Sequence, residues 1–260
     1  MSYIVFDLEF NQAWSHGEDK GAVNPRCSSE IIQIGALVLD EQLHVLSTFD
    51  RLIKPELYTR LHPFVEQITG ITEEKLAAAM SFEEVFGEFR RLISFDSVLC
   101  VWGTADIREL IRNIRYHKLD ASLIPMEYIN VQTYASRYLH CPKGTNAGLR
   151  IAAELLDIPI EGRFHDALND ARYTAEIFRH IYSSSIKPAI YKEDTGARTP
   201  GPERKSKVDT EKLIKQFEKM YDRPMTEEER AIIKLAYLMG KTGQFQSTQA
   251  AKGGFPEERS

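Results

Sequence analysis

The chain has 260 residues, of which 43% are hydrophobic and 27% charged, and its formal net charge is −5. This length suffices for one or two domains that bury a core without disulfides. The negative charge argues against a broad, unspecific electrostatic surface for nucleic acid.

The three cysteines, Cys27, Cys100 and Cys141, match no zinc-binding spacing and are expected to be reduced thiols. The first residues lack the basic region of a signal peptide. No apolar run approaches the roughly 20 residues that span a bilayer. We therefore expect a soluble cytoplasmic protein without a membrane partner.

Residues 3–10 alternate between two faces and predict a β-strand. The polar residues 11–29 predict a long loop. Two further strands are predicted at residues 30–39 and 44–54, with a turn between them. We expect these three strands to form an antiparallel meander.

The pattern then becomes helical. A short helix at residues 63–69 is predicted to end at Gly70, and Ser81 with Glu84 forms a capping box that opens another helix. The remaining predicted elements are strands at residues 98–102 and 128–131, and helices near residues 105–117, 133–139, 147–156 and 166–182. A meander followed by alternating strands and helices predicts an α/β fold with a mixed sheet and helices packed on it.

The composition changes after residue 183. Residues 184–207 are rich in Ser, Pro and Gly and predict a linker. Residues 208–240 predict a helical hairpin, whose second helix opens with a capping box at Thr226 and Glu229. Residues 241–260 predict a disordered tail. The hairpin could bind a protein partner, pair in a homodimer, or pack back on the first domain.

Asp7 and Glu9 are the first candidates for chemistry. Residues i and i+2 of a strand point to the same side, about 7 Å apart along the backbone. Two carboxylates in an apolar strand are costly to bury alone, and a hard divalent cation is a natural partner. A solvated edge strand is the alternative, but the flanking Tyr3, Val5 and Phe10 favour a central strand.

Three later residues are candidates of the same kind. Asp106 follows an apolar strand, although an acidic residue in a first helical turn also complements the helix dipole. His165 and Asp170 stand at the start of the last long helix, where they could instead serve as a cap and a salt bridge. Imidazole has an ordinary pKa near 6.5, which suits a general base at neutral pH.

Together these residues form an ordered pattern of Asp-x-Glu, a mid-chain aspartate after Trp102-Gly103, and His-x-x-x-x-Asp. The pattern resembles the DEDDh (DnaQ-like) exonucleases, which include the proofreading subunit of bacterial DNA polymerase III, oligoribonuclease and RNase T. The segments FDLEF (6–10), EIIQIGA (30–36), TGIT (69–72) and SF (81–82) resemble this family too. The most similar branch holds the histone-mRNA 3′ exonuclease and the bacterial KapD-like proteins. The resemblance covers residues 3–183.

The resemblance implies a ribonuclease H-like fold, with a five-stranded mixed sheet flanked by helices, and a metal-dependent 3′→5′ exonuclease. Asp7 would bridge two Mg²⁺ or Mn²⁺ ions, Glu9 and Asp170 would complete the first site, and Asp106 would hold the second ion. His165 would deprotonate the attacking water. Two ions about 4 Å apart can stabilise both the attacking and the leaving oxygen, and the products would be nucleoside 5′-monophosphates.

Family position also implies substrate contacts at Phe10, Asn11, Phe64, Gly70 and Ile71. Many relatives have a threonine shortly after the first glutamate, whereas this chain has Phe10-Asn11, which puts the stacking of the terminal base in doubt. Ile71 is explained equally well as a core residue under a loop. Stacking on such apolar groups would tolerate any sequence.

Single-stranded RNA is the favoured substrate and short DNA the alternative, because the contacts that read a 2′-OH cannot be placed from the sequence. A second hypothesis is an exonuclease-like module that binds nucleic acid or protein through its C-terminal helices. The presence of all five catalytic-type residues argues against an inactive module.

Overall fold

The computed structural model describes residues 1–13, 23–142 and 144–192 and, further along, residues 210, 214–215, 217–218 and 223–241. The chain divides into two compact units, Met1–Thr195 and Gly196–Ser260. None of the helices that the structure describes has both the length and the apolar character that crossing a bilayer would require. The first unit holds all five residues of the predicted site.

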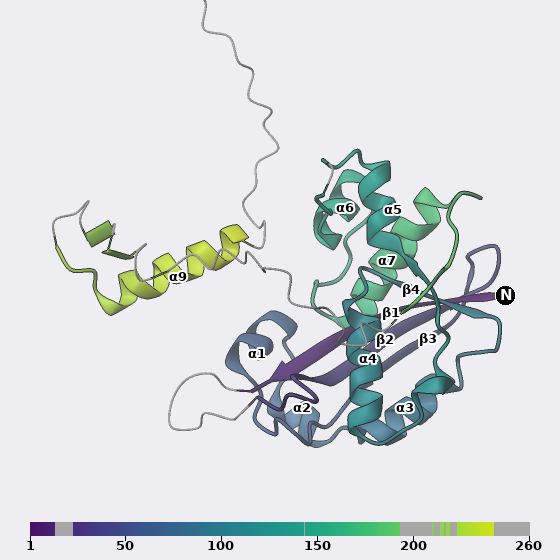
Figure 1. The fold of residues 1–260 in the computed structure, drawn as a ribbon, viewed down its shortest axis with the longest axis horizontal. Helices are drawn as coiled ribbons and strands as arrows, with labels where there is room; N and C mark the ends of the chain where they lie inside the picture. The colour runs from purple at the N-terminus through teal and green to yellow at the C-terminus, as the bar shows by residue number, and fades with distance from the viewer. Residues whose placement is uncertain are drawn as a thin grey trace, which may run out of the picture. The chain divides into compact units, whose positions relative to one another are not determined.

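A six-stranded sheet in the order β3-β2-β1-β4-β5-β6 forms the centre of the first unit (Figure 1). The predicted antiparallel meander consists of β1 (Ser2–Gln12), β2 (Ser29–Leu39) and β3 (Val45–Leu52). β4 (Ser97–Val101) pairs parallel with β1, and β5 (Glu127–Asn130) pairs parallel with β4. β1 therefore has a strand on each side, which confirms its predicted central position.

The sixth strand corrects the prediction of a five-stranded sheet. β6 (Ala189–Ile190) pairs antiparallel with β5, and it falls within residues 184–207, which were predicted to be a linker. The next residue also stays on the sheet, because the Tyr191 N–H donates to the Met126 carbonyl at 2.7 Å. A strand of two residues is too short to show an alternating pattern. The Ser- and Pro-rich composition around it therefore predicted a linker instead.

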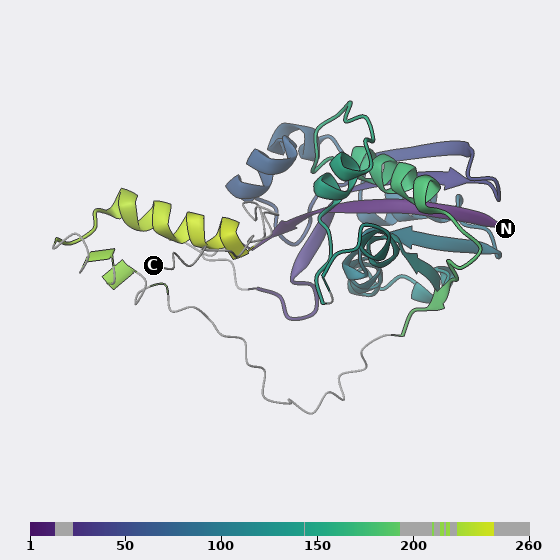
Figure 2. The same ribbon diagram turned by 90° about the horizontal axis from the view of Figure 1, so that it is seen from above.

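Helices cover both faces of the sheet (Figures 1 and 2). One face carries α5 (Val131–Tyr138), α6 (Leu149–Leu155) and α7 (Ala167–Ile181), and the other carries α3 (Phe82–Arg90) and α4 (Ala105–Tyr116). α1 (Pro63–Thr69) and α2 (Glu73–Ala77) belong to a third, smaller cluster, and a short 3-10 helix at Ala121–Leu123 precedes β5. Of the helices in this unit, α2 and the 3-10 helix were not predicted from the sequence.

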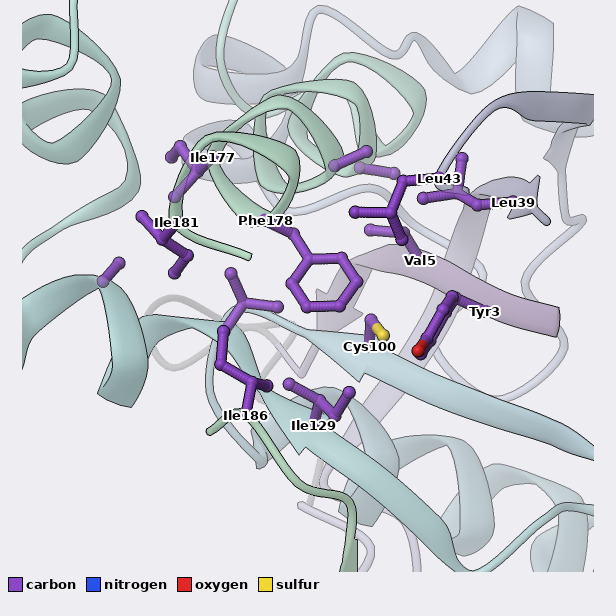
Figure 3. Close-up of a cluster of buried hydrophobic side chains, with 14 of the residues drawn as sticks. Tyr3, Val5, Leu39, Leu43, Cys100, Ile129, Ile177, Phe178, Ile181 and Ile186 are labelled. Atoms are coloured by element: carbon purple, nitrogen blue, oxygen red, sulfur yellow. The ribbon is translucent and has the colours of Figure 1, made fainter. Parts of the chain in front are cut away.

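Alternate residues of β1 enter two separate cores. Tyr3 and Val5 pack under α7, where Figure 3 shows the ring of Phe178 directed at them and at Cys100. The even-numbered residues from Ile4 to Leu8 pack against α3 and α4 on the other face. The strand is therefore apolar on both sides until the α7 side reaches Asp7 and Glu9.

The predicted helix boundaries have the expected caps. Gly70 ends α1 in the left-handed conformation, with φ of 67°, and its N–H donates to the Glu66 carbonyl. Ser81 and Glu84 form both hydrogen bonds of the capping box that opens α3. These local signals depend on a few neighbouring residues, which is why the sequence located them correctly.

In the second unit, the structure describes one long helix, α9 (Glu227–Lys241). The predicted capping box is present, since the Thr226 N–H donates to Glu229 Oε2 at 2.9 Å and the Glu229 N–H donates to Thr226 Oγ1 at 3.2 Å. The first helix of the predicted hairpin is described only at residues 210, 214–215 and 217–218, and the predicted tail lies outside the described residues except for Lys241. The hairpin and the domain boundaries stay predictions.

Candidate active site

The end of β1 presents two carboxylates on the side that faces α7. Asp7 lies opposite Gly35 of β2 and is partly exposed, whereas Glu9 lies opposite Gln33 and is 7% exposed. The β1–β2 register shifts directly after Glu9. The two side chains therefore lie at the last regular positions of a central strand.

α4 brings Asp106 to the same edge of the sheet. β4 runs parallel to β1 and ends at Val101, and Asp106 is the second residue of the helix that follows. Because parallel strands end at one edge of a sheet, Asp106 comes close enough for its charge to raise the pKa of Asp7. Asp106 is only 8% exposed. An acidic residue can complement the helix dipole while it is exposed to solvent. The burial of Asp106 is therefore not explained by the helix dipole alone.

The start of α7 contributes Asp170 and, just before the helix, His165. Asp166 caps the helix by accepting a hydrogen bond from the Asn169 N–H, and the His165 N–H donates to Asp170 Oδ2 at 3.1 Å. His165 has φ of 62°, in the left-handed region that non-glycine residues seldom adopt. The residue is exposed, although part of its ring is buried, and one ligand atom each from Glu9, His165 and Asp170 lie within 4.8 Å of one another.

Two residues of β2 allow α7 to approach the sheet so closely. At Gly35, a Cβ atom would lie 2.1 Å from the carbonyl carbon of Ala167. Gln33 is buried; its Oε1 accepts from the Ala167 N–H at 3.2 Å, and its Nε2 donates to Asp50 Oδ1 at 2.9 Å. The start of α7 is thereby seated on β2, next to the carboxylates of β1.

Burial raises the pKa values of all four carboxyl groups, and repulsion within the cluster adds to this for Asp7, Glu9 and Asp106. Burial is the largest cause of the raised pKa of Asp7, followed by the charges of Asp106, Asp170 and Glu9. Burial, with the charges of Asp170 and Asp106, raises the pKa of Glu9 to about 8. Burial is also the main cause that raises the pKa of Asp106 to about 7 and that of Asp170 to about 6. Such a cluster favours any cation that can take the place of the protons.

The donor set fits divalent metal ions. Among the described residues, no lysine or arginine forms an ion pair with any of the four carboxylates. Asp170 Oδ1 is buried and has no hydrogen-bond partner in that part of the chain. Buried carboxylates without partners are costly, and carboxylate oxygens are the ligands that hard divalent cations prefer.

Comparison with protein families identifies the family of this domain. The family model RNase_T, described as exonuclease, matches residues 4–178, which contain all five site residues. The chain belongs to the RNase_T exonuclease family. The predicted resemblance to the DEDDh exonucleases is thereby confirmed.

Curated relatives agree with this RNase_T membership. The "3′-5′ exoribonuclease 1" of Homo sapiens is 24% identical over 162 residues, which cover 59% of this chain and 46% of that protein. The "Probable 3′-5′ exonuclease KapD" of Bacillus subtilis is 24% identical over 189 residues, covering 69% of this chain and 84% of that protein. The chain thus matches about half the length of the mammalian exoribonucleases.

Solved structures share the fold. The nuclease domain of 3′hExo, a DEDDh family member bound to rAMP, has a TM-score of 0.60 at 22% identity and covers 74% of this chain and 96% of its own. The S. pombe protein Pop2p, in its Mg²⁺- and Mn²⁺-bound form, has a TM-score of 0.54 at 18% identity. The match covers 70% of this chain and 83% of the Pop2p chain. These similarities confirm the predicted ribonuclease H-like exonuclease fold.

Two of the predicted substrate residues of this RNase_T exonuclease are at least partly exposed to solvent. Phe64 on α1 is 53% exposed, and Phe10 at the end of β1 is partly exposed. Gly70 is the C-cap of α1, at the other end of this short helix from Phe64. These three positions keep their predicted role as candidates.

The side chains of Asn11 and Ile71 do not fit the predicted substrate contact. Asn11 is fully buried; its Nδ2 donates to the carbonyls of Tyr58 and Arg60, at 2.7 and 2.9 Å, and its Oδ1 accepts from the His62 N–H at 3.0 Å. Ile71 is 5% exposed and packs in the α1–α2 cluster. Asn11 therefore holds the loop before α1, and Ile71 is the core residue that the alternative described.

Two arginines that were not among the predicted site residues act on His165 through their charges. Burial is the largest cause of the lowered pKa of His165, followed by the charges of Arg150 and Arg163. The guanidinium of Arg150 also lies over the ring of Phe164, 4.5 Å from its centroid. The position of Arg163, two residues before the catalytic-type histidine, was the one signal that could have drawn attention to it.

A second group of metal-ligating side chains, Glu56, Glu83 and His117, lies apart from this site. Their ligand atoms lie within 4.8 Å of one another, but both glutamates are exposed. His117 Nδ1 lies 3.0 Å from Glu83 Oε1, and its ring stacks on Phe82. This arrangement is accounted for as a contact between α3 and the end of α4.

Proposed function

We propose that the protein is a metal-dependent 3′→5′ exonuclease that removes nucleoside 5′-monophosphates from the 3′ ends of single-stranded nucleic acid, with RNA favoured over DNA. The observation that carries this proposal is the convergence of four carboxylates and one exposed histidine at the edge of the sheet, with no ion pair from a lysine or arginine to those carboxylates among the described residues. Membership of the RNase_T exonuclease family supports the same reaction.

Asp7, Glu9, Asp106 and Asp170 would hold two Mg²⁺ or Mn²⁺ ions. When bound, such ions supply charge neutralisation and Lewis acidity for phosphodiester hydrolysis. The protein itself holds the carboxylates in place through three independently anchored elements, β1, α4 and α7. Carboxylates that are already gathered need no rearrangement when a cation binds, which favours a preorganised site.

His165 is proposed as the general base that takes a proton from the attacking water. Its lowered pKa keeps the imidazole neutral at pH 7, so that a ring nitrogen can accept the proton. The hydrogen bond from its backbone N–H to Asp170 fixes the residue next to the carboxylates, while the exposed imidazole can reach solvent and substrate. Hydrolysis of a terminal phosphodiester needs a base that is fixed beside the carboxylates and also accessible to water and substrate.

The preference for RNA rests on the relatives. The human, mouse and rat relatives are exoribonucleases by name, and a structural neighbour is a 3′-exonuclease that recognises the 3′ end of a histone mRNA stem-loop. The Caenorhabditis elegans relative is named simply a 3′-5′ exonuclease. RNA is therefore the first substrate to test and DNA the necessary comparison.

The test uses single-stranded RNA and DNA labelled at the 5′ end, with Mg²⁺, Mn²⁺ or EDTA. We expect a metal-dependent ladder that shortens from the 3′ end, faster on RNA than on DNA. Asp7→Asn and His165→Ala should abolish it, whereas His180→Ala, which changes an exposed histidine of α7, should not. Intact substrate with every metal would contradict the proposal and favour the binding module acting through the C-terminal helices.

A further inference from the structure

Arg163 connects two parts of the structure that lie far apart in the sequence. Its Nη2 donates to the carbonyl oxygen of Ile68 at 2.8 Å, across 95 residues. Ile68 lies in the last turn of α1, where carbonyl groups have no partner within the helix. A guanidinium is well suited to this position, because cations are favourable at a helix C-terminus. The arginine therefore ties α1 to the segment that carries His165.

Gly70 leaves the space that this arginine occupies. Gly70 has φ of 67°, and a Cβ atom at this position would lie 1.9 Å from Nη1 of Arg163. Even alanine at residue 70 would therefore displace the guanidinium, in addition to straining the left-handed backbone. The absence of a side chain at Gly70 thus leaves room for the guanidinium of Arg163 at the end of α1.

The backbone around Arg163 is fixed to α7. The Tyr173 hydroxyl accepts from the Gly162 N–H at 2.8 Å and donates to the Gly162 carbonyl at 2.7 Å, and Asn169 Nδ2 donates to the Arg163 carbonyl at 3.3 Å. Phe164 is buried, with its ring 4.7 Å from that of Tyr173. The segment is therefore held by α7 on one side and, through the Arg163 side chain, by α1 on the other.

His165 follows directly and has an unfavourable backbone conformation with an exposed side chain. Such conformations persist only where the surrounding contacts impose them. We propose that Arg163 is a positioning residue, which uses its contact with Ile68 and Gly70 to hold His165 beside Glu9 and Asp170. Because α1 also carries the substrate candidate Phe64, the same contact couples the place where a 3′ end would bind to the base that acts on it. This inference rests on the proposed function.

The test compares Arg163→Gln, Arg163→Lys and Gly70→Ala in steady-state kinetics on single-stranded RNA with Mn²⁺. In Arg163→Gln a displaced base should lower kcat about 10- to 100-fold, while KM stays near the wild-type value because substrate binding is not lost. Gly70→Ala should lower kcat as well, and only its kcat is compared, because Gly70 is itself a candidate substrate contact. Arg163→Lys keeps a donor for the Ile68 carbonyl and should retain most of the wild-type kcat. Arg137→Gln, which changes an exposed arginine of α5, is the matched control and should match the wild type.

A double variant shows whether Gly70 and Arg163 act on kcat through one shared contact or independently of each other. Gly70→Ala and Arg163→Gln break the same contact, so the combined variant should be no slower than the slower single variant. Wild-type kcat in Arg163→Gln, or fully multiplicative losses in the double variant, would overturn the proposal. A raised KM at unchanged kcat would overturn it as well, because it would make Arg163 a substrate contact.

Amide hydrogen exchange supplies a readout that does not depend on activity. Residues 162–166 should exchange faster in Arg163→Gln than in the wild type or in Arg137→Gln, at matched Tm. Unchanged exchange in this segment would overturn the positioning role. An inactive wild-type protein would contradict the proposed function, and the exchange experiment would still show whether the arginine holds the segment.

Discussion

Two sets of buried acidic side chains in the first unit differ in their partners. Glu30, 2% exposed, accepts three backbone N–H groups, from Glu56, Leu57 and Tyr58, at 2.6 to 2.8 Å. Glu109, 7% exposed, lies three residues past Asp106 on the same helix and forms an ion pair with Arg112 at 2.8 Å. Both carboxylates have the donors that a buried charge needs.

Among the described residues, the four carboxylates of the candidate site form no ion pair with a lysine or arginine, although Asp170 accepts a hydrogen bond from the His165 N–H. They repel one another, and their pKa values are raised above the ordinary range. The difference separates acids that are buried to hold the chain from acids that are buried to hold a ligand. Equivalent substitutions in the two sets should therefore have opposite consequences for stability and activity.

Glu9→Gln is expected to have the largest effect on activity. Loss of a metal-ligand oxygen should lower the exonuclease rate by at least about 1000-fold, while the free energy of unfolding of the metal-free protein stays equal or rises, because one repelling charge is removed. Rate assays with Mn²⁺ and urea denaturation in EDTA measure the two quantities. A variant that retains activity, or that unfolds far more easily in EDTA, would contradict the account.

Gly35→Ala tests how α7 is seated. The new Cβ would meet the backbone of Ala167, so the start of α7 must move away from β2. We expect a loss of about 1 to 3 kcal/mol in the free energy of unfolding and a loss of about 100-fold in kcat. Gly87→Ala is the matched control, since nothing lies within 4 Å of a Cβ atom there. Equal behaviour of the two variants would show that the close approach is unimportant.

Glu30→Gln should reverse the pattern of Glu9→Gln. The amide cannot accept all three N–H groups as the carboxylate does, so the free energy of unfolding should fall by about 2 to 3 kcal/mol. The rate per folded molecule should stay within a few-fold of wild type, because Glu30 lies outside the site. Denaturation curves measure the loss of stability, and exonuclease rates divided by the folded fraction measure the activity. A stable but inactive variant would place Glu30 in the catalytic machinery.

The smallest predicted effect is a dependence of stability on pH. The pKa values of Glu9, Asp106 and Asp170, about 8, 7 and 6, lie above the ordinary carboxyl range. The folded state therefore binds more protons than the unfolded state between about pH 4 and 8, and stability falls as pH rises through this window. In EDTA we expect Tm to drop by about 5 °C from pH 5 to pH 8.

Mn²⁺ should restore the lost stability at pH 8, because the cation replaces the protons. The drop in Tm should be smaller in Glu9→Gln, which lacks the group with the most strongly raised of these three values. The same drop in wild type and Glu9→Gln would mean that other groups cause the pH dependence.

The sequence predicted the features that depend on local pattern or on family order. Alternation along β1 placed Asp7 and Glu9 on one side of a central strand, and the capping box located the start of α3. The five site residues followed from their order and from the resemblance. The cytoplasmic location and a partner for the C-terminal helices stay predictions.

The sequence could not reveal contacts between distant segments. The side chain of Asn11 binds carbonyl groups about 50 residues away. Gly35 is needed because the backbone of α7 lies against it, and Arg163 binds the C-terminal end of α1. These residues resemble ordinary polar or turn residues until the fold brings their partners together. The functional site was thus easier to predict than the contacts that support it.

The central claim, that the four clustered carboxylates form a divalent-cation site, is tested most directly by Mn²⁺ binding. Mn²⁺ is titrated into the metal-free protein at pH 8 while the free ion is followed by electron paramagnetic resonance. Wild type and Glu30→Gln are predicted to bind Mn²⁺ equally, and Glu9→Gln at least about tenfold more weakly. Equal Mn²⁺ binding by Glu9→Gln and wild type would contradict the claim.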